Sequence, residues 1–218
     1  MGSTVARAAL PALASVRDEV ERYYSERFRQ FGPTPLGVGW TCTPTQELRF
    51  VQFERLLGFH RAFSVNDIGC GYGALLGFLR RRDRKAQVDY VGTDISQVMV
   101  DAARRHWKRV DGAHFQLSGE ALRTADYCVA SGIFNVKLAH DRSTWEGYIE
   151  ETLRDMYAHC NAGIVVNFFI ADAELDDIPE HYRCLPDKWV AYGRTLGASV
   201  ELRDNYGMPE FTLALRRH

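Results

Sequence analysis

A short glycine-rich segment carries the clearest chemistry in the sequence. The residues Asp67-Ile68-Gly69-Cys70-Gly71-Tyr72-Gly73 follow an apolar run that predicts a buried strand. Alternating glycines let the chain turn sharply and let a ligand approach bare backbone, because no side chain stands in the way. A second predicted strand ends at Asp94, whose carboxylate could accept hydrogen bonds from both hydroxyls of a ribose. The sequence therefore predicts a site for a nucleoside-containing ligand where two strands end.

This pattern by itself fits two classes of cofactor. Gly69, Gly71 and Ala74 also satisfy the G-x-G-x-x-G/A fingerprint of dinucleotide-binding proteins, in which Asp94 would bind the ribose of NAD. Asp67, however, places a negative charge two residues before the first glycine, which suits a cationic ligand group better than a pyrophosphate. We also expect no second domain of the size that dehydrogenases usually use for their substrate. An NAD-dependent oxidoreductase remains an alternative, as does a non-catalytic cofactor-binding module.

The elements that must position these residues alternate between strand and helix from residue 63 onward. Apolar runs predict buried strands at 65–68, 88–93, 113–117, 126–130 and 164–170. Helical spacing of apolar residues predicts helices at 74–82, 96–108, 144–160 and 186–197. Two closing strands, at 198–202 and 211–215, flank a turn at Asn205-Tyr206-Gly207 and predict a hairpin. The expected fold is α/β, with a doubly wound, mostly parallel seven-stranded sheet and a C-terminal antiparallel hairpin.

The first 62 residues predict a helical extension. Apolar side chains recur at helical spacing over 13–31, and Thr43-Pro44-Thr45-Gln46 has the form of a capping box, with Thr43 as the cap and Pro44 at the first helical position. We therefore expect two parts, an N-terminal helical extension over 1–62 and a ligand-binding α/β domain over 63–218. The extension is expected to fold over the bound ligand as a lid.

From residue 44 to 218, the order of elements and four short motifs resemble the class I S-adenosylmethionine-dependent methyltransferase family. Asp67 to Gly73 is similar to its motif I, whose glycine backbone meets the methionine end of the cofactor and whose acidic residue helps to hold the ammonium group. Asp94 matches the ribose-binding acid, and Gly119-Glu120-Ala121 is similar to the segment beside the adenine. Ser131-Gly132-Ile133-Phe134-Asn135 falls where the family lines the methyl-transfer site.

The resemblance implies S-adenosyl-L-methionine as the cofactor and in-line methyl transfer to a small molecule. The residues expected to bind the cofactor are Asp67, Gly69, Cys70, Gly71, Tyr72, Gly73, Asp94, Ile95, Gly119, Glu120, Ala121, Ser131 and Arg49, the last through the methionine carboxylate. The residues expected to line the acceptor site are Trp40, Phe134, Asn135, Asn167 and Tyr206. His140, as a general base, and Tyr206 are the catalytic candidates.

The sequence departs from the family pattern at two places. Glu120 stands where Asp is commoner, which puts the adenine contact in doubt. The segment after the fourth expected strand of the α/β domain lacks the Asn-Pro-Pro-Tyr signature of enzymes that methylate nucleic-acid bases.

Composition narrows the partners and the compartment. With 27 basic and 28 acidic residues the net charge is -1, so no overall positive field favours a nucleic acid. The five cysteines form no C-x-x-C pair, and no Cys/His cluster is present, so we expect a reducing compartment and no metal site. No apolar run approaches the ~18 residues of a membrane span. We therefore expect a cytoplasmic enzyme whose partner is a small-molecule substrate, and we allow for a homodimer.

Overall fold

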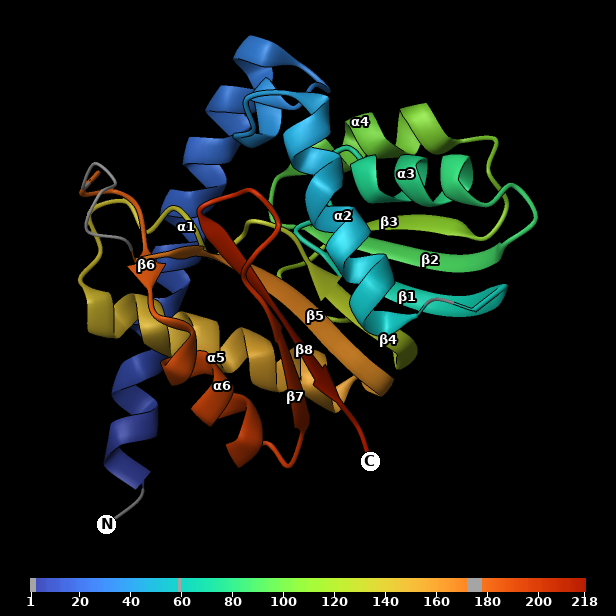
Figure 1. Cartoon of the computed structure of the whole chain (residues 1–218). Coiled ribbons are helices and arrows are strands. Elements are labelled where there is room, and N and C mark those ends of the chain that lie inside the picture. The colour runs from blue at the N-terminus through green and yellow to red at the C-terminus, as the bar shows by residue number, and fades with distance from the viewer. Residues whose placement is uncertain (1–2, 59, 172–177) are drawn as a thin grey trace.

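An eight-stranded sheet runs through the protein in the computed structural model, which describes residues 3–58, 60–171 and 178–218, with side chains from residue 14 (Figure 1). The strand order is β3-β2-β1-β4-β5-β8-β7, and β6 pairs with β5 off this path. The strands are β1 (Ala62–Ile68), β2 (Gln87–Asp94), β3 (Ala113–Leu117), β4 (Ala125–Ala130), β5 (Cys160–Ile170), β6 (Arg183–Cys184), β7 (Ser199–Arg203) and β8 (Glu210–Arg216). The helices are α1 (Ser3–Phe31), η1 (Leu36–Val38), α2 (Thr43–Leu57), α3 (Ala74–Arg82), α4 (Gln97–Trp107), α5 (Arg142–Ala158) and α6 (Pro186–Thr195).

The sheet has the predicted mixed topology. Strands β1 to β5 pair in parallel, whereas β8 is antiparallel to both β5 and β7. The reversal of strand order at β1 and β4 brings the carboxyl ends of neighbouring strands together, as expected for a doubly wound sheet. The expected fold class is confirmed, with one addition: the two-residue strand β6 pairs in parallel with the end of β5. It was missed because two residues carry no periodicity.

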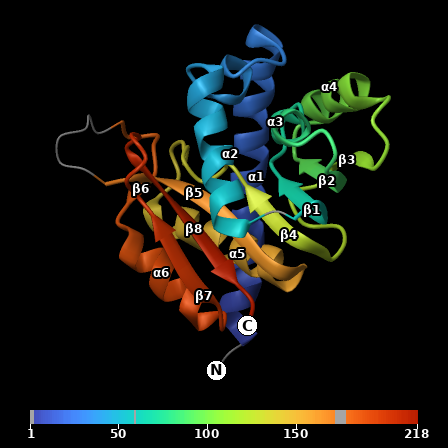
Figure 2. The same ribbon diagram turned by 45° about the vertical axis from the view of Figure 1, so that its right-hand side comes forward.

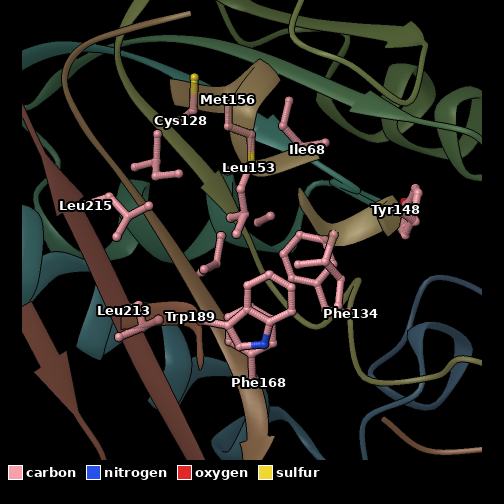
Figure 3. Close-up of a cluster of buried hydrophobic side chains, with 14 of the residues drawn as sticks. Ile68, Cys128, Phe134, Tyr148, Leu153, Met156, Phe168, Trp189, Leu213 and Leu215 are labelled. Carbon is pink, nitrogen blue, oxygen red and sulfur yellow. The ribbon is translucent and has the colours of Figure 1, made fainter. Parts of the chain in front are cut away.

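Two hydrophobic cores cover the two faces of the sheet. On one face, Leu153 of α5 and Trp189 of α6 are packed in the same cluster as Phe168 of β5 and Leu213 of β8 (Figure 3). Phe168 stacks on Trp189 at a centroid distance of 5.4 Å, with the two rings nearly parallel. On the other face, side chains from α2, α3 and α4 pack on β1 and β2. Burial on both faces explains the continuous apolar character of the strands.

The helical extension contributes to both cores. Val16 and Val20 of α1 belong to the cluster on the α5 face, and Phe53 and Leu56 of α2 belong to the cluster on the opposite face. Figure 2 shows the long helix α1 running from near the N-terminus past the sheet, and α1 contacts α4 and α5. Helix α1 begins at Ser3, ten residues before the expected start. Within the described part of the chain, none of the helices combines the length and apolar character that crossing a membrane requires.

Candidate functional site

A pocket of ≈ 860 Å³, its open mouth included, lies where β1, β2 and β4 end. Its lining comes from the segments after β1, β2, β3 and β4 and from the helical extension. The lining residues are Val20, Tyr24, Val38, Trp40, Gln46, Phe50, Asp67–Tyr72, Ala74, Leu75, Asp94, Ile95, Met99, Ser118, Gly119, Ser131–Ile133 and Tyr148.

The glycine loop after β1 is bonded to the end of β2. The N–H groups of Gly69 and Cys70 donate to the Thr93 carbonyl at 2.8 and 3.0 Å. The N–H of Gly71 donates to Oδ2 of Asp94 at 2.8 Å. Gly69 and Gly71 have φ angles of 72° and 55°, in the region that favours glycine. These three amides are therefore already engaged within the protein.

Asp67 is a buried carboxyl group at the base of the pocket. The Tyr90 hydroxyl donates to its Oδ2 at 2.5 Å. Burial raises the pKa of Asp67 to about 7, against the lowering effect of the Tyr90 hydrogen bond, and the nearby Asp94 carboxylate raises it further. A cationic group in the pocket would favour the ionised form of Asp67.

Asp94 is the second buried carboxyl group in the pocket. Burial raises its pKa to about 6, against the hydrogen bonds from the Ser96 and Gly71 backbone. Its Oδ1 accepts from the Ser96 N–H at 2.9 Å and its Oδ2 from Gly71. Because each carboxylate oxygen can accept more than one hydrogen bond, acceptor capacity remains for ligand hydroxyls. Asp94 therefore holds the loop in place and can also face a ribose.

The extension supplies an aromatic wall and one amide. Tyr24, Trp40 and Phe50 line the pocket with Gln46, whose Oε1 accepts from the Tyr72 hydroxyl at 3.2 Å. The capping-box expectation for Gln46 is wrong: Cys42 is the N-cap of α2, and its side chain accepts no capping hydrogen bond from the first turn. The Gln46 side chain is 5% exposed and turned toward the pocket instead.

Ser131 and Gly132 form the floor after β4. The Ser131 hydroxyl is buried and has no hydrogen-bond partner among the residues that the structure describes. The Gly132 N–H donates to Oδ1 of Asn167 at 2.9 Å, and a Cβ at Gly132 would overlap the Trp40 indole. The site therefore offers an unused hydroxyl group beside a glycine that allows close contact with the extension.

The structure brings most of the expected cofactor residues to the pocket. Those that line it are Asp67, Gly69, Cys70, Gly71, Tyr72, Asp94, Ile95, Gly119 and Ser131, together with Trp40 from the expected acceptor site. Gly73 is the N-cap of α3, with the Trp107 indole against it, and the Ala121 N–H donates to Asp155 at 2.8 Å.

Arg49 is engaged away from the pocket lining. Its side chain is 3% exposed, and its guanidinium forms an ion pair with Glu210 of β8 and also donates to the Thr45 carbonyl. The Trp40 ring lies over it at 3.5 Å from the centroid. The expected pairing with a cofactor carboxylate is thus replaced by a pairing within the protein, because Glu210 supplies the anion.

Three further polar candidates have partners outside the pocket lining. Glu120 is half exposed and pairs with Arg17 at 2.9 Å. His140 lies 3.4 Å from Glu19 of α1. The Tyr206 hydroxyl is within hydrogen-bond distance of Thr212 Oγ1, at 3.1 Å. The roles expected for them remain predictions without support from the pocket geometry.

The remaining residues expected to line the methyl-acceptor site are buried inside the protein. Phe134 is fully buried and stacks on Phe168 at 5.2 Å, so its side chain belongs to the core instead of a substrate surface. Asn135 accepts from the Phe169 N–H at 3.1 Å and Asn167 bonds Gly132 and Glu210. These asparagines support the loops that carry the pocket.

Sequence reasoning missed the residues that enter the pocket from a distance. Tyr24 and Tyr148 belong to the apolar stripes of their helices, and Met99 follows the cap of α4. Such positions are indistinguishable from core residues in a sequence. Gln46 is visible in the sequence only as part of a pattern that predicts helix capping.

Comparison with known proteins identifies the relatives of this chain. The family described as "Methyltransferase domain" matches residues 66–165. A Mycobacterium tuberculosis (strain H37Rv) protein, provisionally named methyltransferase Rv1506c, is 36% identical over 165 residues, which are 75% of this chain and 98% of that protein.

Solved structures share the fold at low sequence identity. Magnesium protoporphyrin IX methyltransferase from Synechocystis PCC 6803, solved with bound S-adenosylhomocysteine, is similar with a TM-score of 0.67 and 15% identity, over 95% of this chain and 100% of that one. Human N-acetylserotonin methyltransferase, solved with S-adenosylmethionine, is similar with a TM-score of 0.56 and 18% identity, over 100% of this chain and 68% of that one.

Proposed function

Since the chain belongs to the class I S-adenosylmethionine-dependent methyltransferase family, we propose that its pocket binds S-adenosylmethionine and transfers the methyl group to a small-molecule acceptor. The observation that carries the proposal is that two buried carboxyl groups, Asp67 and Asp94, line the pocket beside the glycine loop. A carboxylate beside the glycine loop repels a pyrophosphate, whereas an ammonium group and two ribose hydroxyls need acceptors.

The residues present fit this cofactor. Gly69 and Gly71 let Ile133 and Val38, which also line the pocket, approach the loop more closely than a residue with a Cβ would allow. Asp94 would hold the ribose hydroxyls and Asp67 the ammonium group. The unpartnered Ser131 hydroxyl supplies one further polar contact inside the pocket. When bound, the cofactor supplies an electrophilic methyl group.

The protein's own contribution is positioning and exclusion of water. The aromatic wall from α1, α2 and the segment between η1 and α2 lines the pocket together with the strand ends. Holding the acceptor in line with the methyl–sulfur bond can by itself supply a large part of the rate enhancement. A concave pocket lined by both the strand ends and the helical extension favours a small acceptor over a polymer. We therefore propose a small-molecule acceptor.

Titration calorimetry tests the cofactor assignment. We expect S-adenosylhomocysteine to bind with one molecule per chain, and NAD not to compete with it. Binding of NAD without S-adenosylhomocysteine would contradict the proposal. Asp94→Asn is a matched variant, because it retains one acceptor oxygen and the size of the side chain.

The second half of the proposal needs a transfer assay. The protein is incubated with methyl-labelled S-adenosylmethionine and a low-molecular-mass filtrate of a cell extract, and labelled products are separated. We expect label in a small molecule, and none with Gly71→Val. Tight cofactor binding without any transferred label, across several extracts, would favour a non-catalytic binding module.

A further inference from the structure

A buried network joins the helical extension to the floor of the pocket. Arg49 of α2 forms an ion pair with Glu210 of β8, and Glu210 Oε2 accepts from the Asn167 side chain at 3.2 Å. Asn167 in turn accepts from the Gly132 N–H at 2.9 Å. Because Trp40 lies over Arg49 and against Gly132, the contacts form a closed ring from wall to floor.

The ring has a composition that stability alone does not favour. Arg49 and Glu210 are 2% and 1% exposed, and Asn167 is fully buried. Removing two charges from water costs more than a well-packed apolar pair would, so such pairs are often kept for the geometry they impose. A planar guanidinium can stack on an indole while its edge donates to a carboxylate. Both contacts are present at Arg49.

We propose that Arg49 and Glu210 are positioning residues that hold Trp40 against Gly132 and thereby set the closed shape of the pocket. The inference rests on the proposed function for its ligand, and it assigns Arg49 a role other than binding the cofactor carboxylate. Trp40 and Gly132 line the pocket, whereas Arg49 and Glu210 act on it through them. The network therefore couples the seating of the extension to the shape of the site.

Two ligands separate the two roles of Arg49. S-adenosylhomocysteine carries the amino-acid carboxylate, whereas 5′-methylthioadenosine has the same nucleoside and sulfur but lacks that group. If Arg49 bound the carboxylate, its loss would weaken only S-adenosylhomocysteine. If Arg49 positions the wall, its loss weakens both ligands by a similar factor.

The main variant is Arg49→Met with Glu210→Gln, because it removes both charges and leaves no unpaired buried ion. We expect the Kd of both ligands to rise about tenfold, as when only a tenth of the molecules hold the closed pocket. Trp40→Ala should raise both Kd values similarly. Arg49→Lys keeps the charge but loses the planar group, so it should raise the Kd of both ligands by an intermediate factor. It replaces the double variant in the test if the double variant does not fold.

The matched control is Glu54→Gln, which breaks the exposed ion pair between α2 and Arg82 of α3, 2.9 Å long. It should leave both Kd values unchanged. A selective loss of S-adenosylhomocysteine binding in the Arg49 variants, or unchanged affinity for both ligands, would overturn the proposal.

Hydrogen exchange at Gly132 provides a readout that needs no ligand. Its N–H is bonded to Asn167, so the double variant should exchange this amide faster, while amides at the centre of β1 remain protected. An unchanged rate at Gly132 would also overturn the proposal. If the unaltered protein bound neither ligand, the proposed function would fail, and this rate would still decide the role of the network.

Discussion

Lowering the pH from 8 to 6 should weaken cofactor binding through Asp67. Burial raises the pKa of this carboxyl to about 7, so a growing fraction is neutral below that pH. In the proposed complex the ionised form pairs with the ligand ammonium group. The neutral form loses that attraction, and binding must then be accompanied by release of the proton.

The size of the effect follows from the fraction ionised. For one required carboxylate with a pKa of about 7, the Kd should rise roughly tenfold between pH 8 and pH 6. Asp94, with a pKa of about 6, adds a further loss as the pH falls below its own value. Asp67→Asn should bind more weakly at pH 8 and show a flatter profile down to pH 6.

Calorimetry with S-adenosylhomocysteine in two buffers of different ionisation enthalpy measures the Kd and the number of protons released on binding. We expect proton release near pH 6.5 in the unaltered protein and little in Asp67→Asn, which also controls for titration of the ligand. Tyr90→Phe removes the hydroxyl that donates to Asp67, so the onset of weakening should move to higher pH. A Kd independent of pH, with no proton release, would refute the assignment of Asp67.

The raised pKa of Asp67 makes the ligand-free protein more stable at low pH, whereas it makes ligand binding weaker at low pH. Because the folded pKa of Asp67 lies above the unfolded value of 3.8, its contribution to stability is fully present below that value and is lost as the pH rises through about 7. Asp67→Asn should therefore raise the melting temperature at pH 8 relative to the unaltered protein, and not at pH 4. The opposite ordering would argue against a raised pKa.

Three substitutions test the remaining structural claims. Asp94→Ala should weaken S-adenosylhomocysteine binding by about 1–3 kcal/mol through lost ribose hydrogen bonds, measured by calorimetry, and an unchanged affinity would remove Asp94 from the site. Gly71→Val should abolish binding in a folded protein, because φ is 55° and the new Cβ would lie 3.0 Å from Val38; retained binding would count against the loop geometry. Leu153→Ala, in the core of α5, should lower the free energy of unfolding by about 2–5 kcal/mol in urea titrations and leave the Kd unchanged.

The sequence by itself predicted the parts of the site that depend on local properties. Gly69 and Gly71 indicate a tight loop because only glycine adopts a positive φ without strain. Asp94 is the last residue of β2, so the end of the strand pattern locates it. The parallel sheet and its closing hairpin could be predicted because the spacing of apolar residues along the chain differs between strands and helices. Each of these features depends only on residues that lie close to it in the sequence.

Only the tertiary structure decided which charges and aromatic rings meet. Arg49 and Glu210 are 161 positions apart, so nothing local indicates that Glu210, and not a ligand, neutralises the guanidinium. Phe134 lies in the core and Gln46 in the pocket for the same reason, since the side of an element that faces a cavity depends on how the other elements pack against it. Burial, which raises the pKa of Asp67, likewise exists only once both faces of the sheet are covered.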